Sequence, residues 1–471
     1  MSAAPQPRPP MADLEGRKVL FVAYFFPPTV STGVPGCMRT IKFLRNLQGG
    51  DCHVLTTTEA QLEDKDSALR HVQLPVHGET LHRVGSWDLF KALLALRTFI
   101  KSLLGKGRQP AQQPVTSAFK TSTDQSGPAA SRSRLQRLKD FVYDLCYFPD
   151  QAGPWIIPAF FRGRRVVKKH RIDVIFATGS PWSGLIVGYL ISRFTGKPLI
   201  VDFRDPWMNN PFHHSKGTML DRWALNWEKR IVARAQGVSL NTEPLRQEFL
   251  ERYPEQPSSK FFVMPNGYDL ADFPALETSS TPNNRIITLC HVGFLYGVRD
   301  PATLLDAIQL ANKTLAAEGR QVRFRQIGDV QLGYDIRERY QTMLADGSLI
   351  LDAAQPYQAC LQALSNADMV VNIQPATRSQ VPSKLYDYLA INRPILNITP
   401  TDGALGHMVE NYGLGELFDF NEAELLSQRL VELARSDATE RNFSGYANRY
   451  LFDTRKTATD LAEKIKELTA P

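Results

Sequence analysis

The sequence has few cysteines, and none of them has the spacing of a metal site or a disulfide framework. There are five among 471 residues, and no two form a C-x-x-C pair. An odd, scattered set of cysteines is typical of proteins in a reducing compartment. We therefore expect neither disulfides nor a zinc site, and we expect a cytoplasmic location.

Long hydrophobic runs are also missing. A membrane-spanning helix needs about 18 consecutive apolar residues, and no stretch of this chain has them. The first apolar run, residues 19–26, is short and lacks the small-residue cleavage site of a secretory signal peptide. We interpret it as the first strand of a folded domain.

Charge of one sign is only slightly in excess, since the formal net charge is +7. A mild positive excess suits phosphates, nucleotides or an anionic membrane surface. No nucleic-acid-binding motif accompanies it, so no nucleic-acid partner is expected. The hydrophobic fraction of 43% and the charged fraction of 22% are ordinary for globular chains. They exclude a wholly disordered, collagen-like or coiled-coil protein.

Apolar strand-like runs alternate with amphipathic helical stretches twice along the chain. The first series starts with the run at 18–24, followed by a loop rich in glycine and proline and a helical stretch at 38–47. The second series starts at Ile286–Val292. Continuous apolar strands joined through helices are typical of parallel sheets covered on both faces. The sequence thus predicts an α/β protein with two Rossmann-like, doubly wound domains.

Composition predicts where the domains begin and end. The segments are a disordered tail at 1–16, an N-terminal domain at 17–275, a C-terminal domain at 285–450 and a C-terminal helix within 451–471. Residues 108–134 are rich in Gln, Ser, Thr and Pro, which predicts a disordered insertion inside the first domain.

An amphipathic helix is predicted at residues 87–106, with leucines on one face and basic residues opposite or at its edges. Such a helix either lies in an anionic membrane surface or packs on its own domain with its lysines in water. Both interpretations stay open. Peripheral contact with the inner face of the cytoplasmic membrane is therefore an expectation.

Three loops of the first domain follow predicted strands, which is where α/β sheets bind ligands. Gly33 lies in the first loop, which is either a ligand loop or a tight turn. Gly179 and Ser180 either hold a ligand or cap the next helix. Arg204 and Asp205 follow a buried strand; either the carboxylate lies beside a reaction centre, or an Asp–Arg pair fixes the loop.

Two further segments lie in the second domain. Gly293, Tyr296 and Arg299 follow its first strand, where glycine admits a ligand and an arginine can pair with phosphate. Pro382 and Ser383 predict a helix start, where Lys384 suits a diphosphate. Asp387, one turn on, suits ribose hydroxyls, and a surface Lys–Asp pair is the alternative. The adjacent His291 is interpreted as a core histidine.

In their order along residues 18–465, these motifs resemble those of bacterial GT-B glycosyltransferases of the family 4 type, a group found in polysaccharide assembly. The segments that carry the resemblance are Phe26–Gly33, Asp202–Trp207, Pro265–Asp269, Gly293–Arg299, Gly328-Asp329 and Pro382–Ala390. The resemblance implies transfer of a sugar, with retention, from a nucleotide-sugar donor in the C-terminal domain. The acceptor, a lipid-linked or polysaccharide precursor, would bind the N-terminal domain.

The resemblance also implies roles for single residues. Asp205, with Arg204, would lie at the reaction centre, and Gly33, Gly179 and Ser180 would face the acceptor. The donor would be held by Gly293, Tyr296, Arg299, Ser383, Lys384 and Asp387. No metal or other cofactor is expected, because the nucleotide sugar is a substrate.

Two other functions stay open. The GT-B architecture also hosts nucleotide-sugar 2-epimerases. A catalytically silent scaffold of a glycan assembly complex is the other alternative, because Phe294 and Ser379 stand where the family often has charged residues. Asp205, Lys384 and Asp387 favour an enzyme.

Overall fold

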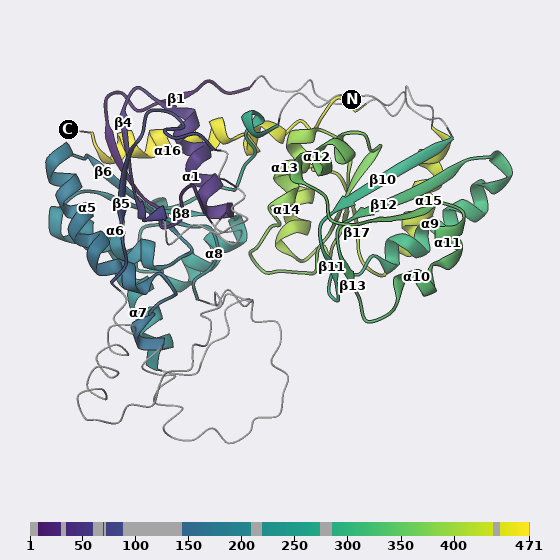
Figure 1. The fold of residues 1–471 in the computed structure, drawn as a ribbon, viewed down its shortest axis with the longest axis horizontal. Helices are drawn as coiled ribbons and strands as arrows, with labels where there is room; N and C mark the ends of the chain where they lie inside the picture. The colour runs from purple at the N-terminus through teal and green to yellow at the C-terminus, as the bar shows by residue number, and fades with distance from the viewer. Residues whose placement is uncertain are drawn as a thin grey trace, which may run out of the picture.

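Two parallel sheets form the centres of two α/β domains (Figure 1). The computed structural model describes residues 8–29, 34–59, 69, 72–87, 144–208, 219–273, 285–436 and 443–470. Gly33, the insertion predicted at 108–134 and nearly all of the helix predicted at 87–106 lie outside the described residues. Within them, no helix combines the length and the apolar character needed to cross a membrane.

The N-terminal domain has a seven-stranded sheet in the order β5-β4-β2-β6-β7-β8-β9, with every neighbouring pair parallel. Its strands are β2 (Lys18–Val22), β4 (Asp51–Thr57), β5 (Thr80–Val84), β6 (Val174–Gly179), β7 (Leu199–Phe203), β8 (Gly237–Leu240) and β9 (Phe261–Val263). Its helices include α1 (Val34–Asn46), α5 (Ile156–His170), α6 (Ser183–Thr195), α7 (Met219–Arg234) and α8 (Glu243–Arg252). A short parallel pair joins β1 (Ala12–Asp13) to β3 (Leu47–Gln48).

The C-terminal domain has a six-stranded parallel sheet in the order β14-β12-β10-β15-β16-β17. Its strands are β10 (Ile286–Val292), β12 (Gln321–Ile327), β14 (Leu349–Asp352), β15 (Met369–Ile373), β16 (Ile395–Ile398) and β17 (Glu416–Phe418). Its helices are α9 (Ala302–Leu315), α10 (Ile336–Arg339), α11 (Gln341–Ala345), α12 (Tyr357–Ser365), α13 (Lys384–Ile391), α14 (Ala404–Tyr412) and α15 (Ala423–Arg435). A small ladder pairs β11 (Leu295–Tyr296) with β13 (Val330–Gln331).

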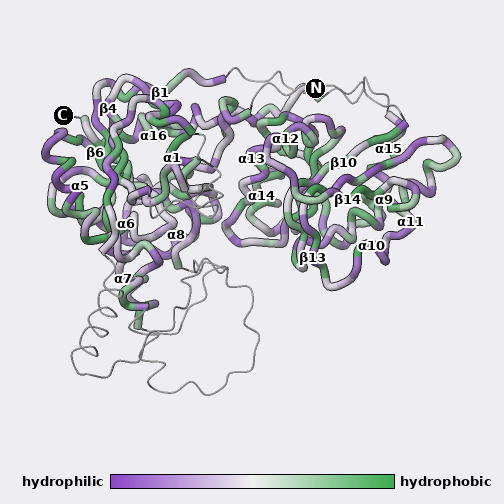
Figure 2. Tube along the Cα trace, in the orientation of Figure 1, coloured by the Kyte–Doolittle hydropathy of each residue, from purple (hydrophilic) through white to green (hydrophobic). Residues whose placement is uncertain are grey.

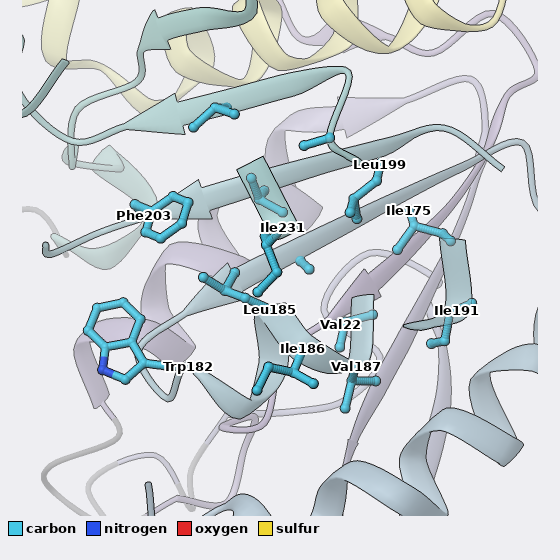
Figure 3. Close-up of a cluster of buried hydrophobic side chains, with 14 of the residues drawn as sticks. Val22, Ile175, Trp182, Leu185, Ile186, Val187, Ile191, Leu199, Phe203 and Ile231 are labelled. Atoms are coloured by element: carbon cyan, nitrogen blue, oxygen red, sulfur yellow. The ribbon is translucent and has the colours of Figure 1, made fainter. Parts of the chain in front are cut away.

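Hydrophobic residues cover both faces of each sheet. In the N-terminal domain, one cluster packs side chains such as Val22 and Phe203 against α6, as Figure 3 shows, and a second cluster lies on the other face. The C-terminal sheet likewise has a cluster on each face. Figure 2 shows hydrophobic and hydrophilic residues alternating along outer helices such as α5, as expected of helices with one buried face. Burial on two faces explains why the strands are continuous apolar runs.

The last helix, α16 (Thr454–Leu468), returns to the N-terminal domain and packs beside α1 (Figure 1). Leu461 and Ile465 are buried in the same cluster as Ile41 and Leu44 of α1. Asp453 starts the helix, because its carboxylate accepts a hydrogen bond from the backbone N–H of Arg455. The C-terminal helix is thus part of the N-terminal domain in space.

The chain crosses between the domains at two adjacent segments. The backbone N–H of Thr454 donates to the carbonyl of Tyr268 at 2.9 Å, so the two crossings are hydrogen-bonded to each other. Arg8 binds both segments, through Asp269 at 3.0 Å and Asp453 at 2.8 Å. The disordered tail predicted over 1–16 is therefore wrong for residues 8–16, since these ion pairs and the burial of Leu14 hold them in place.

The α/β class and the two doubly wound sheets are confirmed. The strand predicted at Ile286–Val292 has the predicted bounds, and the run predicted at 18–24 begins at the first residue of β2. The edge strands β5, β9 and β17 were missed. They are short and only partly buried, so they lack the continuous apolar run that marks a central strand.

Candidate active site between the two domains

A cleft of about 1300 Å³ lies between the domains. The N-terminal domain contributes α1 and the loop after β7, and the C-terminal domain contributes α12 and α13. Four of the predicted site residues line it: Arg204, Asp205, Ser383 and Asp387. The fold therefore brings residues from both predicted halves of the site to one place.

Asp202, the fourth residue of β7, holds the N-terminal wall of this cleft together. Its buried carboxylate accepts hydrogen bonds from Arg39 Nε at 2.9 Å and Nη2 at 2.8 Å, and from the hydroxyls of Thr178 and Ser239. Arg39, on α1, also donates to the carbonyl of Met264 at 2.7 Å. Both charges are fully engaged, so this pair fixes α1 against the sheet. This pair differs from the Asp–Arg pair considered from the sequence, because its arginine is Arg39 of α1 and not Arg204 of the loop.

Arg204 is oriented by backbone carbonyls of the preceding strand end. Its Nε donates to Gly179 O at 3.2 Å, and its Nη2 donates to Ser180 O. A Cβ atom on Gly36 would lie 2.6 Å from Arg204 Nη2, so glycine there lets the start of α1 approach the guanidinium closely. Burial lowers the pKa of Arg204, and the nearby Asp205 opposes that shift. Gly179 and Ser180 thus act on the cleft through Arg204.

Asp205 touches the other domain. Gln380 Nε2 of the C-terminal domain donates to Asp205 Oδ1 at 3.1 Å. Beside it, the hydroxyl of Thr242 donates to the carbonyl of Ser379 at 2.8 Å. The carboxylate predicted to lie at the reaction centre is therefore positioned by a contact that depends on how the two domains sit.

A second polar cluster lies at the start of α13. Lys384 Nζ is 3.4 Å from His291 Nε2, and His291 Nδ1 is 2.6 Å from Gln326 Oε1. Gln326 Nε2 donates to the carbonyl of Gly293, so its oxygen must accept from His291. His291 therefore carries its proton on Nδ1 and accepts from Lys384 at Nε2. Burial, with Lys384 nearby, lowers the pKa of His291 to about 3, which keeps the ring neutral.

The charges in this cluster are unbalanced. Burial and the neighbouring Arg299 lower the pKa of Lys384 to about 8, although Asp387 opposes this. The Arg299 guanidinium lies 5.3 Å from the ring centre of Tyr296, and its buried Nε has no partner among the described residues. Gly293 has φ +117°, and a Cβ atom there would lie 2.5 Å from Lys384 Nζ. Two cations at a helix N-terminus next to a glycine form a site suited to an anion.

Asp387 lies one turn further along α13 and faces the cleft. Burial raises its pKa to about 6, and Asp272 across the cleft adds to the rise, whereas Lys42 and Lys384 lower it. The hydroxyl of Tyr357 hydrogen-bonds to it. The hydroxyl of Tyr386, which also lines the cleft, has no partner among the described residues. These groups can accept from and donate to the hydroxyls of a polar ligand.

Known families and structures match this chain in both sequence and fold. Residues 122–272 match the model of Glycosyltransferase Family 4. This segment of the chain is therefore similar to the glycosyltransferase family 4 domain. This match includes Gly179, Ser180, Arg204 and Asp205. A comparison with curated proteins finds no match.

Solved structures share the whole fold of this glycosyltransferase. Anabaena Alr3699/HepE in complex with UDP is 14% identical, with a TM-score of 0.51 over 96% of this chain and 100% of that chain. Sucrose-phosphate synthase from Thermosynechococcus elongatus is 12% identical, with a TM-score of 0.50 over 97% and 99%. The N-terminal domain of Candida albicans trehalose-6-phosphate phosphatase is 11% identical, with a TM-score of 0.54 over 99% of each chain. At these identities the likeness concerns the fold.

The prediction of a GT-B glycosyltransferase of the family 4 type is confirmed by the family match and the fold. The site residues stay predictions. The structure places Gly293, Tyr296, Arg299 and Lys384 in the cluster at the start of α13, whose other residues, Ser383 and Asp387, line the cleft. Sequence reasoning missed Arg39, Gln326 and Tyr386, and it did not foresee that the buried His291 contacts Lys384.

Proposed function

We propose that this enzyme transfers a sugar from a nucleotide-sugar donor, bound mainly by the C-terminal domain, to a glycan or lipid-linked acceptor on the N-terminal domain. The observation that carries the proposal is the cation cluster of Lys384 and Arg299 beside Gly293, at the edge of the cleft that holds Asp205. Retention of the anomeric configuration is part of the proposal and rests on the family 4 resemblance.

The chemistry of sugar transfer explains why cations are needed there. Breaking the anomeric C–O bond builds positive charge on the sugar and negative charge on the leaving diphosphate. Prearranged donors that face this developing negative charge lower the barrier. Lys384, Arg299 and the N-terminus of α13 would supply that stabilisation from the chain itself. We propose no step that uses a metal ion.

The remaining residues would position the two substrates. Asp387 would accept hydrogen bonds from ribose hydroxyls, since it lies one turn beyond Lys384 and faces the cleft. Arg204 and Asp205 would face the sugar and the acceptor from the opposite wall. Because Gln380 reaches Asp205 from the other domain, domain closure would set the geometry of that carboxylate and exclude water from the donor.

A thermal-shift comparison tests the donor site. Wild-type protein would be heated with UDP, GDP, ADP and dTDP and with their sugar conjugates. A ligand at about 100 times its Kd adds about 2.7 kcal/mol to the native state. We expect one nucleotide to raise the Tm of the wild type and of Lys313→Ala, an exposed lysine on α9, but not of Lys384→Ala. A shift that survives in Lys384→Ala would show that the donor site is wrongly placed.

The two alternative functions, a 2-epimerase and a scaffold without catalysis, predict different results with the same proteins. A 2-epimerase would turn over UDP-GlcNAc with no acceptor present. A scaffold without catalysis would turn over no donor, and its partner binding would survive Asp205→Ala and Lys384→Ala. Transfer of sugar to an added acceptor, lost in Lys384→Ala, would exclude both.

A lipid-linked acceptor would place the enzyme at the inner face of the cytoplasmic membrane, and we propose peripheral contact there. The segment proposed for it, residues 87–106, lies almost entirely outside the described residues. Flotation with vesicles tests the idea, because a basic helix binds anionic lipid in preference to neutral lipid. Equal recovery with both kinds of vesicle would contradict it.

A further inference from the structure

Three histidines meet at the edge of the N-terminal sheet, away from the cleft. In the β4–β5 ladder, His53 is paired with Thr80 and Leu55 with His82. Because side chains alternate along a strand, His53 and His82 point to the same face of the sheet. Helix α5 contacts both strands and ends at His170. The fold thus brings one imidazole from each of three elements to one point.

The distances suit a shared ligand. His53 Nδ1 lies 3.1 Å from His82 Nε2, and the ring centres of His53 and His170 are 4.5 Å apart. One ring nitrogen from each histidine lies within 4.8 Å of the others. In a tetrahedral site with zinc–nitrogen distances near 2.0–2.1 Å, the ligand nitrogens are about 3.4 Å apart. The three nitrogen atoms are therefore near the spacing that a shared ion requires.

The surroundings leave room for a fourth ligand. A hollow of about 500 Å³ adjoins the cluster and is lined by His53 and His170, together with Asp51, Cys52 and His77. His53 and His82 are buried, and His170 is half-buried. Imidazole binds a metal ion in its neutral form, which is the form that burial favours.

We propose that His53, His82 and His170 bind a divalent transition-metal ion, with Zn²⁺ as the best match, and that water from the adjoining hollow completes the coordination. Imidazole nitrogen is a preferred ligand of zinc, copper and nickel. The ion would tie the edge strand β5 and its neighbour β4 to the end of α5. The positive charges of Lys169 and Arg162 act on His82, and they limit the affinity of the site for a cation.

The site is independent of sugar transfer. His53 lies near the start of β4, and His170 precedes β6, so the cluster sits toward the amino ends of the parallel strands. The cleft residues Arg204 and Asp205 follow the carboxyl end of β7. We therefore infer a stabilising metal rather than a reacting one. This proposal differs from the expectation of no metal, which rested on the cysteine pattern and on the family resemblance.

The test uses the full chain without a histidine tag, dialysed against a chelator and titrated with Zn²⁺ in a calorimeter. We expect one Zn²⁺ per chain and a rise in Tm on binding. His170→Gln should lose both, while its metal-free Tm stays near that of the metal-free wild type, because His170 lies at a helix end. His77→Gln, an exposed histidine lining the same hollow, should bind like the wild type.

Three outcomes would overturn the proposal. They are no saturable Zn²⁺ binding, binding that is equal in His170→Gln and wild type, and binding that is lost only in His77→Gln. His82→Gln adds a second test, and His170→Gln keeps the proposal falsifiable where His82→Gln fails to fold. Nucleotide binding should be the same with and without Zn²⁺, which separates this site from the proposed donor site.

Discussion

The two walls of the cleft carry charged centres that differ in how they are balanced. On the N-terminal wall, Asp202 and Arg39 bind each other through two hydrogen bonds, and both have further partners. On the C-terminal wall, Lys384 and Arg299 lie near each other, and the group next to the lysine is a neutral histidine. In the first centre the charges balance each other within the protein, whereas the second centre has an excess of positive charge.

This difference separates structural residues from binding residues. A buried ion pair whose acceptors are filled has nothing to offer a ligand, and its loss costs the protein stability. A cluster of like charges destabilises the fold and is relieved by an anion. The same reasoning assigns Asp202 a structural role and Lys384 a binding role, although Asp202 lies near the end of β7 and Lys384 at the start of α13, both close to the cleft.

The largest expected effect is the loss of stability when the ion pair of Arg39 and Asp202 is broken. Arg39→Met removes the partner of Asp202 and leaves a buried carboxylate without its cation. We expect the free energy of unfolding to fall by about 3–5 kcal/mol, measured by urea denaturation. Arg45→Ala, also on α1 and paired with Asp272, is the control and should cost under about 1 kcal/mol. If Arg39→Met lowers the free energy of unfolding no more than Arg45→Ala does, the Arg39–Asp202 pair is not the structural centre of the N-terminal wall.

Lys384→Met should show the opposite pattern. Removing one donor that stabilises developing negative charge costs about 10²-fold in kcat, so sugar transfer should fall by about that factor. The stability should stay the same or rise, because the repulsion from Arg299 is relieved. Activity and Tm would be measured on the same preparation, with Lys313→Met as control. A loss of stability as large as that in Arg39→Met would show that Lys384 is structural.

The pH dependence of stability and binding sharpens this prediction. The pKa of Lys384 is about 8 in the folded protein and lies below its ordinary value of 10.5. Between these values the unfolded chain binds more protons than the folded chain, so this group's contribution to stability rises with pH across that window. Nucleotide binding needs the ammonium form and should weaken above pH 8, by up to about tenfold per unit. Lys384→Met should flatten both dependences, and equal slopes in the two proteins would contradict the assignment.

Features of the fold and the site that depend on local sequence patterns could be predicted, whereas contacts between distant segments could not. The strand β10 and the helix α13 are recognisable as local apolar patterns, so the sequence predicted that Gly293 follows β10 and that Lys384 begins α13, with Asp387 one turn further on. The partner of Asp202 could not be found that way, because Arg39 lies 163 positions away on a helix whose face shows only in three dimensions. The contact of His291 with Lys384 depends on the start of α13 packing against the carboxyl end of β10, 93 positions away in the sequence.

The histidine cluster is a second example of a site that local sequence patterns do not predict. His53, His82 and His170 have no common spacing, and only the register of β4 against β5 and the length of α5 bring them together. The prediction of a disordered tail was wrong for residues 8–16 for a related reason. Proline content describes how a free chain behaves, but the two carboxylates that bind Arg8 come from segments more than 260 residues further on.

The smallest expected effect concerns the contact that joins the two walls. Gln380→Ala removes the hydrogen bond to Asp205, and a bond of this kind is worth about 0.5–1.5 kcal/mol. We expect kcat to fall several-fold with little change in Tm, since the bond forms between domains rather than inside either core. Gln358→Ala, on the same cleft but on α12, should leave kcat unchanged. If Gln380→Ala lowers Tm and leaves kcat intact, the contact only holds the domains together, and the position of Asp205 does not depend on their closure.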